Sequence, residues 1–292
     1  MMQRTIQRAV EVAGIGLHLG EKARLVLQPA PVNTGVVFRD ANSPASRTVA
    51  AIYSNVKADT VGFCTRLRNL ESGFEVATVE HVLAAIHAAE ITNIHVDVSG
   101  PEIPILDGSS AGFLDALERA GVDEQGSPQS VLTILRPVQV VQADKAAYLL
   151  PRPTSELTIS VEVDFPGRLP RQWTHLDLSE FGRRVASART FTFRQDIDRL
   201  HAMGLAKGGS LSNAVVFDER GVPLNPDGLR FPDEWSRHKA LDVVGDLALA
   251  GLPIHGHYVG IRPGHALTHE LLHALFADHD NFSITTTKPD VP

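Results

Sequence analysis

Residues 235–250 read WSRHKALDVVGDLALA, and this stretch predicts a central helix of the fold. Gly251 and Pro253 follow it, and both residue types commonly end helices. His238 and Asp242 are four positions apart, so a helix places both side chains on one face. This spacing occurs more often in surface pairs than in metal sites. A zinc site would also need a third ligand from elsewhere in the chain. The apolar side of the helix would consist of Leu241, Val244, Gly245, Leu247 and Ala248.

A second helix that carries a possible ligand is predicted over Thr78–Ala89. Thr78 is the expected N-cap, His81 falls in the first turn, and Glu80 precedes it. Two imidazoles and one carboxylate from two helices would form a three-ligand zinc site with an open fourth position, which is the catalytic type. The helical repeat is carried by Val82, Leu83, Ala85, Ile86 and Ala89.

A compact zinc motif lies near the end of the chain, where His269, Glu270 and His273 form H-E-x-x-H, a metalloprotease pattern. His279 has the spacing of a metzincin's third ligand, but Phe276 replaces the required glycine and no methionine follows for a Met-turn. Too few residues follow for a third ligand on a later helix. We therefore expect an amphipathic helix whose polar residues face solvent, with a zinc protease as the alternative. The apolar stripe would be Leu267, Leu271, Leu272, Ala274 and Leu275.

Composition predicts a globular protein of two domains, because 292 residues with 43% hydrophobic content exceed the usual size of one domain. The formal net charge of −7 argues against a nucleic-acid-binding surface. Cys64 is the only cysteine, which excludes an internal disulfide and favours a reducing compartment. No signal-peptide pattern and no membrane-length apolar run is visible, so we expect a cytoplasmic protein without stable membrane insertion.

The predicted elements divide the chain into two halves of similar order, each with strands, a ligand-bearing helix, a strand and another helix. The polar segment Asp123–Gln129 is predicted to link them. We expect an α+β fold with a first domain over residues 1–126 and a second over residues 127–292. Predicted strands are Gln7–Val12, Ala23–Leu27, Val36–Arg39, Ile94–Val98, Val131–Ile134, Val138–Val141, Leu157–Val163, Ala214–Phe217 and Tyr258–Ile261, and the other predicted helices are Ser110–Ala120, Arg194–Met203 and the segment from Ala266.

The glycine-rich turn Gly14–Gly20 contains Gly-x-Gly, a pattern that also occurs in dinucleotide-binding motifs. A strand and not a helix follows this turn, so no helix N-terminus would face a pyrophosphate. We therefore interpret the segment as the turn of a β-hairpin.

Several motifs occur along the chain in a fixed order: Gly14–Gly20, Thr78–Ala85, Pro101–Ser109, Arg189–Phe191, Asn225–Phe231, His238–Asp242 and Gly264–Leu267. Together they resemble the UDP-3-O-acyl-N-acetylglucosamine deacetylases of lipid A synthesis in Gram-negative bacteria. The similarity extends from about Gln3 to about Ala277. It implies two related α+β domains, each a β-sheet layered with helices, with the helical layers packed together and the active site between them. One departure is Thr268, where the family usually has Asn.

The resemblance implies that His81, His238 and Asp242 are zinc ligands, although iron(II) could replace zinc in the cell. Zinc lowers the pKa of bound water to about 7 and polarises a carbonyl group. Amide hydrolysis also needs a carboxylate that takes a proton from the water, and Glu80 stands beside a ligand.

Four further residues match catalytic positions of the family. Thr190 matches a donor to the tetrahedral oxyanion, and His265 matches the acid that protonates the leaving amine. Asp246 matches a carboxylate that keeps this imidazole protonated. Lys239 matches a residue that contacts the substrate phosphate or the reacting centre. From spacing alone, Asp246 and Lys239 could equally face solvent, and His265 could be a surface residue.

An extra β-α-β unit is predicted near residues 190–217. From sequence alone it could be an ordinary surface insertion, whereas the resemblance implies an apolar passage for a fatty acyl chain. Phe165 could stack on uracil, and Arg262 and His18 could bind the diphosphate, but each could equally be a core aromatic or a surface charge. The expected lining of the passage is Phe191, Ile197, Leu200, Ala206, Ala214 and Val216.

The sequence thus predicts a cytoplasmic, monomeric zinc amidase. Its substrate would be UDP-3-O-(3-hydroxyacyl)-N-acetylglucosamine, from which it removes acetate, and it would bind no nucleic acid. Two other classes stay open: a protease that uses His269, Glu270 and His273, and a non-catalytic UDP-sugar- or lipid-binding protein of the same fold. The presence of Glu80 together with all three ligands argues against the non-catalytic class.

Overall fold

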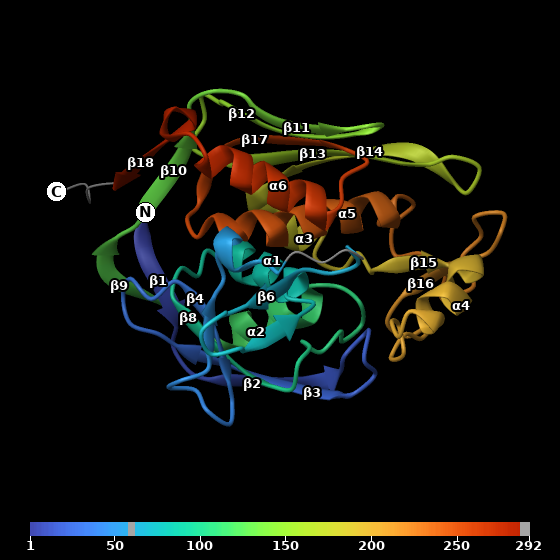
Figure 1. Cartoon of the computed structure of the whole chain (residues 1–292), viewed down its shortest axis with the longest axis horizontal. Helices are drawn as coiled ribbons and strands as arrows, with labels where there is room; N and C mark the ends of the chain where they lie inside the picture. The colour runs from blue at the N-terminus through green and yellow to red at the C-terminus, as the bar shows by residue number, and fades with distance from the viewer. Residues whose placement is uncertain (58–61, 287–292) are drawn as a thin grey trace.

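The structure is a computed structural model that describes residues 1–57 and 62–286 (Figure 1). Two β-sheets form the outer layers, and helices fill the space between them. The lower sheet in Figure 1 has the strand order β2-β3-β8-β4-β5. The upper sheet has the order β11-β12-β17-β10-β18, and β13 and β14 join it through β17. The predicted α+β class, with the helical layers packed together, is confirmed.

The first half of the chain builds the lower sheet and the helices that cover it. Strand β3 alternates between buried and more exposed residues, with Ala23, Leu25 and Leu27 buried, as expected for a sheet covered on one side. The elements are β1 (Met2–Ile6), β2 (Val10–Ile15), β3 (Lys22–Pro29), β4 (Val36–Asp40), β5 (Thr48–Ala50), a 3-10 turn (Tyr53–Asn55), β6 (Arg66–Arg68), β7 (Glu75–Ala77), α1 (Glu80–Ala88), β8 (Ile94–Ser99), α2 (Ala111–Ala120) and β9 (Val122–Pro128).

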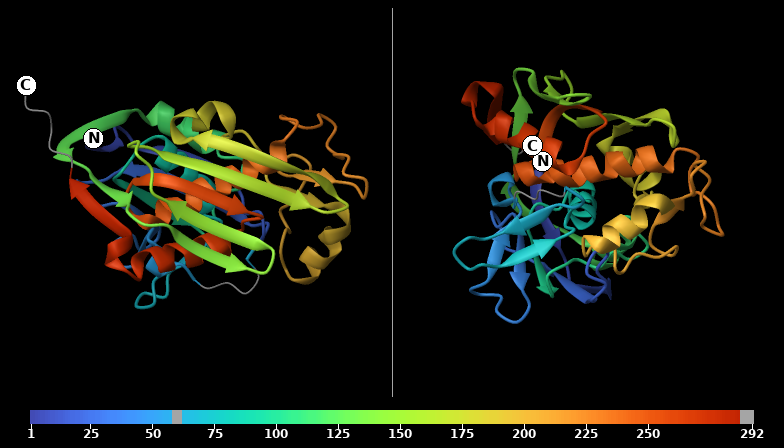
Figure 2. Two further views of the ribbon diagram at one scale, coloured as in Figure 1. Left: turned by 90° about the horizontal axis from the view of Figure 1, so that it is seen from above. Right: turned by 45° about the vertical axis from the view of Figure 1, so that its right-hand side comes forward.

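The second half builds the upper sheet, seen from above in Figure 2, and the remaining helices. None of the described helices is long and apolar enough to span a membrane. The strands are β10 (Ser130–Ile134), β11 (Val138–Gln142), β12 (Lys145–Leu150), β13 (Leu157–Phe165), β14 (Leu169–Asp177), β15 (Phe191–Phe193), β16 (Val215–Phe217), β17 (Ile254–Ile261) and β18 (Phe282–Thr286). The helices are α3 (Phe181–Arg184), α4 (Arg194–Ala202), α5 (Glu234–Leu247) and α6 (His265–Phe276), with 3-10 turns at Leu178–Glu180, Ala248–Ala250 and His279–Asn281.

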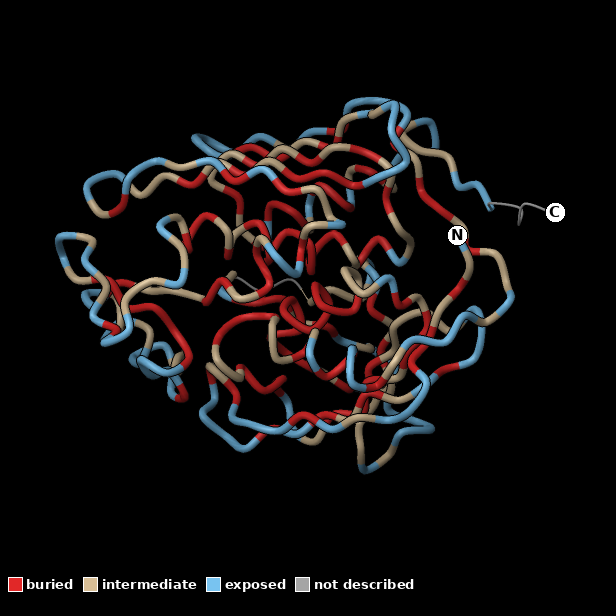
Figure 3. Tube along the Cα trace, turned by 180° about the vertical axis from the view of Figure 1, so that it is seen from behind, coloured by how far each residue is buried: buried red, intermediate tan, exposed pale blue. Residues whose placement is uncertain are grey.

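Helices α1 and α5 cross at the centre of the molecule. Helix α1 is buried continuously from Glu80 to Ile86, and Figure 3 shows the buried positions concentrated between the two sheets. At Gly245 of α5, a Cβ atom would lie only 2.0 Å from the carbonyl oxygen of Glu80. The Ser110 hydroxyl donates a hydrogen bond of 2.9 Å to the carbonyl oxygen of His81. The Gly245 contact fixes the first turn of α1 against α5, and the Ser110 bond ties the same turn to the start of α2.

The β-α-β unit projects from one end of the layers (Figures 1 and 2). Strands β15 and β16 are parallel neighbours, and α4 lies between them in the chain. The unit contacts the glycine-rich hairpin of the first half, where the backbone N–H of Gly208 donates to the carbonyl oxygen of Leu17 at 3.0 Å. A Cβ at position 208 would lie 2.2 Å from the carbonyl oxygen of Gly16, so only glycine fits this contact. The hairpin itself is confirmed as the turn between β2 and β3.

The predicted linker Asp123–Gln129 is wrong. Most of it belongs to β9, which pairs antiparallel with β1. The segment is polar because most of its side chains are exposed or only partly buried. The sequence also does not predict its partner strand, β1. The strand expected at Gln7–Val12 starts at Val10 as β2, and β1 is a separate strand before it. Strand β9 runs across residues 126 and 127, and the domain boundary expected there stays a prediction.

The expected N-cap of α1 is also wrong. Thr78 has a positive φ of 62°, and its hydroxyl donates a hydrogen bond of 3.0 Å to the buried carboxylate of Glu102. The residue before the helix is Val79, and it makes no side-chain capping bond. A tertiary hydrogen bond therefore replaces the local capping bond that the sequence suggests.

Gly245→Ala is expected to destabilise the protein by about 1–3 kcal/mol, because the added methyl group cannot fit between α5 and the Glu80 carbonyl. Urea unfolding would measure this loss. Gly182→Ala in the short helix α3 is the control, because a Cβ there meets nothing closer than the Leu114 side chain at 3.5 Å. Equal unfolding midpoints for both variants would contradict the close approach of α1 and α5.

Candidate metal centre and active site

Three side chains with metal-binding atoms converge where α1 meets α5. Nε2 of His81 is 3.5 Å, and Nε2 of His238 is 3.3 Å, from Oδ1 of Asp242. The two imidazole rings have centroids 5.0 Å apart and are nearly perpendicular. All three side chains are buried, and this Asp242 oxygen accepts no hydrogen bond within the described residues. The structure therefore brings the three predicted ligands together.

The donor atoms fit a tetrahedral zinc ion. Ligand atoms ~2.0–2.1 Å from such an ion are about 3.3 Å from one another, close to the separations from the Asp242 oxygen. Nδ1 of His238 lies 3.0 Å from the carbonyl oxygen of Ala188, so Nδ1 carries the proton and Nε2 keeps its lone pair for a metal. Burial lowers the pKa of His238 to about 4, so the imidazole is neutral, as a ligand must be. Two nitrogens and one oxygen leave a fourth position open.

The H-E-x-x-H residues do not form a second metal site. Within residues 1–57 and 62–286, the only group of three His, Cys, Asp or Glu side chains whose ligand atoms lie within 4.8 Å of one another is the one described above. Glu270 is exposed and accepts a hydrogen bond of 2.5 Å from Gln142. His273 is exposed and packs edge-on against Tyr53, with ring centroids 5.1 Å apart. The protease alternative is therefore not supported.

The expected outward orientation of His269 is wrong. Its side chain is only 12% exposed, and Nε2 lies 3.3 Å from Oδ1 of Asp246 and 3.2 Å from Oγ1 of Thr65. His269 follows His265 by one turn of α6, so both imidazoles face α5. The apolar stripe misled the prediction because this part of the helix interface is polar.

Glu80 lies between the ligand cluster and α6. One carboxylate oxygen accepts a hydrogen bond of 3.0 Å from the backbone N–H of Thr65, and the other is 3.9 Å from Nε2 of His265. Burial raises the pKa of Glu80, and the imidazoles of His265 and His81 oppose that shift without cancelling it. A carboxyl group anchored through one oxygen, with a raised pKa, is suited to take and return a proton.

His265 and Asp246 form a buried pair, with Nδ1 2.8 Å from Oδ2. An ionised carboxylate can only accept hydrogen bonds, so Nδ1 carries a proton. Burial lowers the pKa of His265, but the carboxylates of Asp246 and Glu80 outweigh burial and raise it to about 9. Burial raises the pKa of Asp246, and the neighbouring imidazoles of His265 and His269 lower it by more. The pair therefore favours a protonated imidazole whose Nε2 is directed to Glu80.

A cavity of ≈ 530 Å³ opens beside the ligand cluster and is lined by Thr190, Phe191 and Lys239 together with residues of the upper sheet and α4. Nζ of Lys239 donates a hydrogen bond of 2.9 Å to Oδ2 of Asp242 and lies 5.8 Å from the ring centroid of Phe191. This lysine therefore connects the cavity with the ligand cluster. Among the described residues that line the cavity, basic side chains outnumber acidic ones: Lys145, Arg168, Arg199, Lys239 and Arg262 against Asp164 and Asp196.

The residues expected to bind substrate fall into two groups. Phe165 and Arg262 line the cavity, and so does Leu200. Phe165 lies edge-on to Phe191 with ring centroids 5.6 Å apart, and Arg262 pairs with Asp144. In the described part of the chain, the cavity lining does not include Ile197, Ala206, Ala214, Val216 or His18. His18 is buried in the glycine-rich hairpin.

The sequence alone does not identify the buried residues that hold Thr190 and the glycine-rich hairpin in place. Arg189 makes a two-pronged buried ion pair with Glu234 at the start of α5, with N···O distances of 2.8 and 3.1 Å. This pair anchors the residue before Thr190. Glu102 accepts hydrogen bonds from the backbone N–H groups of His18 and Leu19 at 2.8 and 2.9 Å. Glu102 lies within an otherwise apolar stretch, and this pattern predicts a buried carboxylate that accepts hydrogen bonds.

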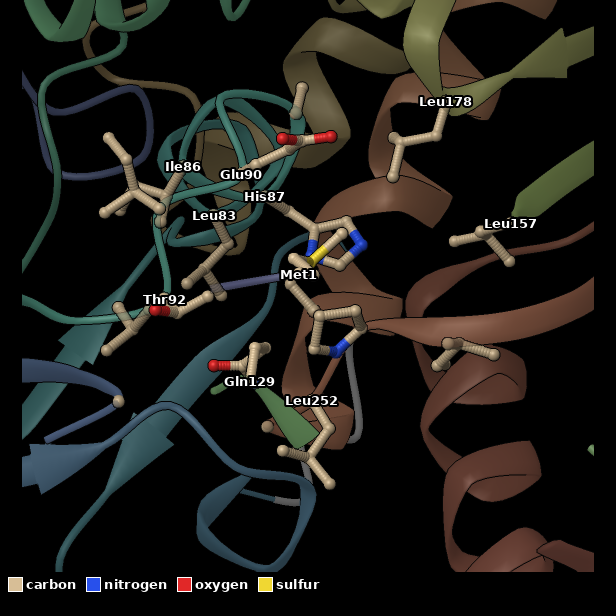
Figure 4. A pocket seen from close by; sticks show the side chains of 18 of the residues that line it. Met1, Leu83, Ile86, His87, Glu90, Thr92, Gln129, Leu157, Leu178 and Leu252 are labelled. Atoms are coloured by element: carbon tan, nitrogen blue, oxygen red, sulfur yellow. The ribbon is translucent and has the colours of Figure 1, made fainter. Parts of the chain in front are cut away.

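A second cavity of ≈ 220 Å³ lies near the other end of α1 (Figure 4). Its lining includes Leu83, Ile86 and His87, and burial lowers the pKa of His87 to about 4. It is lined by none of the three ligands, nor by Glu80 or the residues of α6. The larger cavity beside Lys239 is therefore the candidate substrate site.

A buried two-histidine, one-aspartate cluster with an open position, a neighbouring carboxylate and a protonated imidazole defines the class of metal-dependent hydrolases. The family profile described as "LpxC: UDP-3-O-acyl N-acetylglycosamine deacetylase" matches residues 3–277, so the chain belongs to this family of amide hydrolases of lipid A biosynthesis. The predicted resemblance is confirmed.

Two similar proteins carry names that agree with this family assignment. A protein of Myxococcus xanthus (strain DK1622) is 40% identical over 292 residues, which cover 98% of this chain and 90% of the relative. A protein of Shewanella sp. (strain W3-18-1) is 40% identical over 299 residues and covers 100% of this chain and 96% of the relative. Both are named UDP-3-O-acyl-N-acetylglucosamine deacetylase.

His81→Ala is expected to lower zinc affinity by more than ~100-fold. Loss of a residue that only hydrogen-bonds to a metal ligand already lowers affinity by ~10–100-fold. The larger loss is expected because His81→Ala removes one of three donor atoms. Metal content after dialysis, measured by atomic emission, checks this. His273→Ala is the control for the H-E-x-x-H motif and should keep its metal. Metal loss from the His273 variant, with retention in the His81 variant, would contradict the assignment.

Proposed function

We propose that zinc bound by His81, His238 and Asp242 serves the removal of acetate from UDP-3-O-(3-hydroxyacyl)-N-acetylglucosamine. The observation that carries the proposal is the position of Glu80, which stands beside the ligand cluster with its second oxygen 3.9 Å from Nε2 of His265. A proton acceptor and a proton donor thus flank one small space. The family's activity and the names of the relatives supply the substrate class.

Zinc, when bound, would lower the pKa of a water molecule and polarise the acetamide carbonyl, and iron(II) could supply the same chemistry. The two imidazoles and one carboxylate suit either ion. Burial of all three ligands keeps bulk water from competing for them.

Hydrolysis requires that a carbon–oxygen bond forms and the amide carbon–nitrogen bond breaks. In our proposal, Glu80 takes a proton from the attacking water. His265 gives the proton on Nε2 to the nitrogen of the leaving glucosamine. Asp246 stabilises the imidazolium form of His265 through Nδ1. The products are acetate and the free amine.

Two residues at the cavity are proposed to contact the reacting group. Thr190 would donate to the oxyanion, and its backbone is held by a hydrogen bond of 2.7 Å from its N–H to the carbonyl oxygen of Gly108. Lys239 lies next to Asp242 and would place a positive charge beside the oxyanion or the substrate phosphate. Burial lowers the pKa of Lys239, but Asp242 and its other acidic neighbours raise it overall, so the charge is retained.

The larger cavity is proposed to hold the rest of the substrate. Its excess of basic side chains suits a diphosphate, with Arg262 as one donor, and Phe165 offers an aromatic face to uracil. Phe191 and Leu200 would contact the start of the acyl chain. The remaining passage is proposed to run through the insert along Ile197, Ala206, Ala214 and Val216. A diphosphate contact from His18 would require a path into the buried hairpin.

We further propose that the enzyme acts in the cytoplasm as a monomer and binds no nucleic acid. Cys64 is the only cysteine and is buried, so the chain forms no internal disulfide, which suits a reducing compartment. The net charge of −7 supports the absence of a nucleic-acid surface. The monomeric state stays a prediction that light scattering can test.

Glu80→Ala and His265→Ala should each lower kcat by about 10²–10⁴-fold while keeping bound zinc, because they remove proton-transfer groups and not ligands. Wild-type rate should rise with pH as Glu80 ionises and fall as His265 loses its proton. The pKa of His265 is raised, so the falling limb should lie on the alkaline side. His265→Ala should abolish that limb, and pH–rate profiles at saturating zinc measure it. A falling limb that persists in this variant would show that another group protonates the amine.

Shortening the acyl chain should lower kcat/KM, because about 0.8 kcal/mol of apolar burial is lost per CH₂ group. Steady-state kinetics on a series of UDP-linked substrates with shortened 3-O-acyl chains would measure the dependence. UDP-N-acetylglucosamine without the acyl group is the control. Equal kcat/KM for the acylated and non-acylated compounds would exclude the proposed passage.

A further inference from the structure

The proposed function uses no residue of the H-E-x-x-H motif, but the structure places one of them, His269, against the catalytic pair His265 and Asp246. His269 and His265 lie one turn apart on α6, with ring centroids 6.4 Å apart and nearly parallel planes. Both imidazoles contact the carboxylate of Asp246, but at different oxygens. Nδ1 of His265 is 2.8 Å from Oδ2, and Nε2 of His269 is 3.3 Å from Oδ1.

Thr65 completes this arrangement. Its hydroxyl lies 2.5 Å from Oδ1 of Asp246, 3.2 Å from Nε2 of His269 and 3.3 Å from Nδ1 of His265. A hydroxyl has one proton, and the nearest acceptor is the ionised carboxylate, so Thr65 donates to Asp246. Its oxygen can then only accept hydrogen bonds from the two imidazoles.

These contacts determine the protonation of His269. Nε2 faces two acceptors, the Asp246 carboxylate and the Thr65 oxygen, so it must carry a proton whatever the charge of the ring. Oδ1 of the Asp246 carboxylate thereby accepts hydrogen bonds from two donors, Thr65 and His269. Oδ2 remains free to accept the hydrogen bond from His265. Asp246 and Thr65 are fully buried, so rotation of this carboxylate would break hydrogen bonds that water cannot replace.

We propose that His269 is a positioning residue that holds Asp246, so that His265 presents Nε2 to the space beside Glu80. This inference rests on the proposed role of His265 as the acid of deacetylation. His269 does not reach the ligand cluster or the reacting atoms and acts only through Asp246. The H-E-x-x-H histidine thus serves the catalytic site by a hydrogen bond and not by binding metal.

The effect on His265 has a defined sign. The groups that face this imidazole are Asp246 on α5, Glu80 on α1, and Thr65 in the loop before β6, with Asp242 and His269 farther away. A donor from His269 withdraws negative charge from Asp246. Removal of that donor leaves more negative charge for His265, so the alkaline limb of the rate profile should move to higher pH while the maximal rate falls.

The test compares His269→Leu, which keeps bulk without a donor, with His269→Gln, which restores an N–H at similar reach. His273→Leu, one turn farther along α6 where the side chain is exposed, is the matched control. His269→Leu should lower kcat about 10-fold with little change in KM, within the range that loss of an outer partner costs. His269→Gln should recover most of the rate and the wild-type pH limb. Unchanged kcat and pH limb in His269→Leu would overturn the proposal.

Imidazole ¹⁵N spectra of the zinc-loaded wild type supply a readout independent of turnover and of variant folding. The proposal requires a proton on Nε2 of His269, and a ring protonated at Nδ1 alone would overturn it. If the wild type does not hydrolyse the UDP-linked substrate, the proposed function fails. The spectra then still decide the hydrogen bond to Asp246. The coupling is decided by the His265 signals, which should shift in His269→Leu but not in His273→Leu, and identical His265 signals in these two variants would refute it.

Discussion

The close crossing of α1 and α5 is the constraint on which the rest of the molecule depends. Because residue 245 has no side chain, the α5 backbone approaches the carbonyl oxygen of Glu80. The first turn of α1 then faces the middle of α5, which places His81 beside His238 and Asp242. The sheets on either side cover these helices and keep the crossing buried. A site assembled from both halves of the chain thus follows from one helix–helix contact.

This crossing concentrates charge in a buried place, which is costly unless each charge has a partner. Burial raises the pKa of Asp242, but the neighbouring His238 and Lys239 lower it by more. The pKa therefore lies well below its usual value, and the carboxylate stays ionised. The negative charge of Asp246 is stabilised in the same way by the imidazoles of His265 and His269 on α6. Glu80 has the weakest compensation and its pKa is raised, so it is the carboxylate best suited to exchange protons. One buried region therefore contains carboxylates with different tasks because their neighbours differ.

The helices that carry the ligands could be predicted from sequence because their apolar positions repeat with helical spacing, and the order of motifs indicated the family. Other features depended on tertiary partners that local patterns do not reveal. The residues of strand β9 are polar and predict a linker, because the pairing of this strand with β1 is a long-range contact that local sequence does not show. Thr78 looks like a capping residue but bonds to Glu102 instead. His269 interrupts an apolar stripe, and only the position of Asp246 on another helix shows that it points inward.

The most direct test is an anomalous-scattering map of zinc-loaded crystals, recorded on both sides of the zinc absorption edge. We expect a single strong peak ~2.0–2.2 Å from Nε2 of His81, Nε2 of His238 and a carboxylate oxygen of Asp242. A peak coordinated by His269 and His273, with none at the crossing of α1 and α5, would contradict this assignment of the metal ligands.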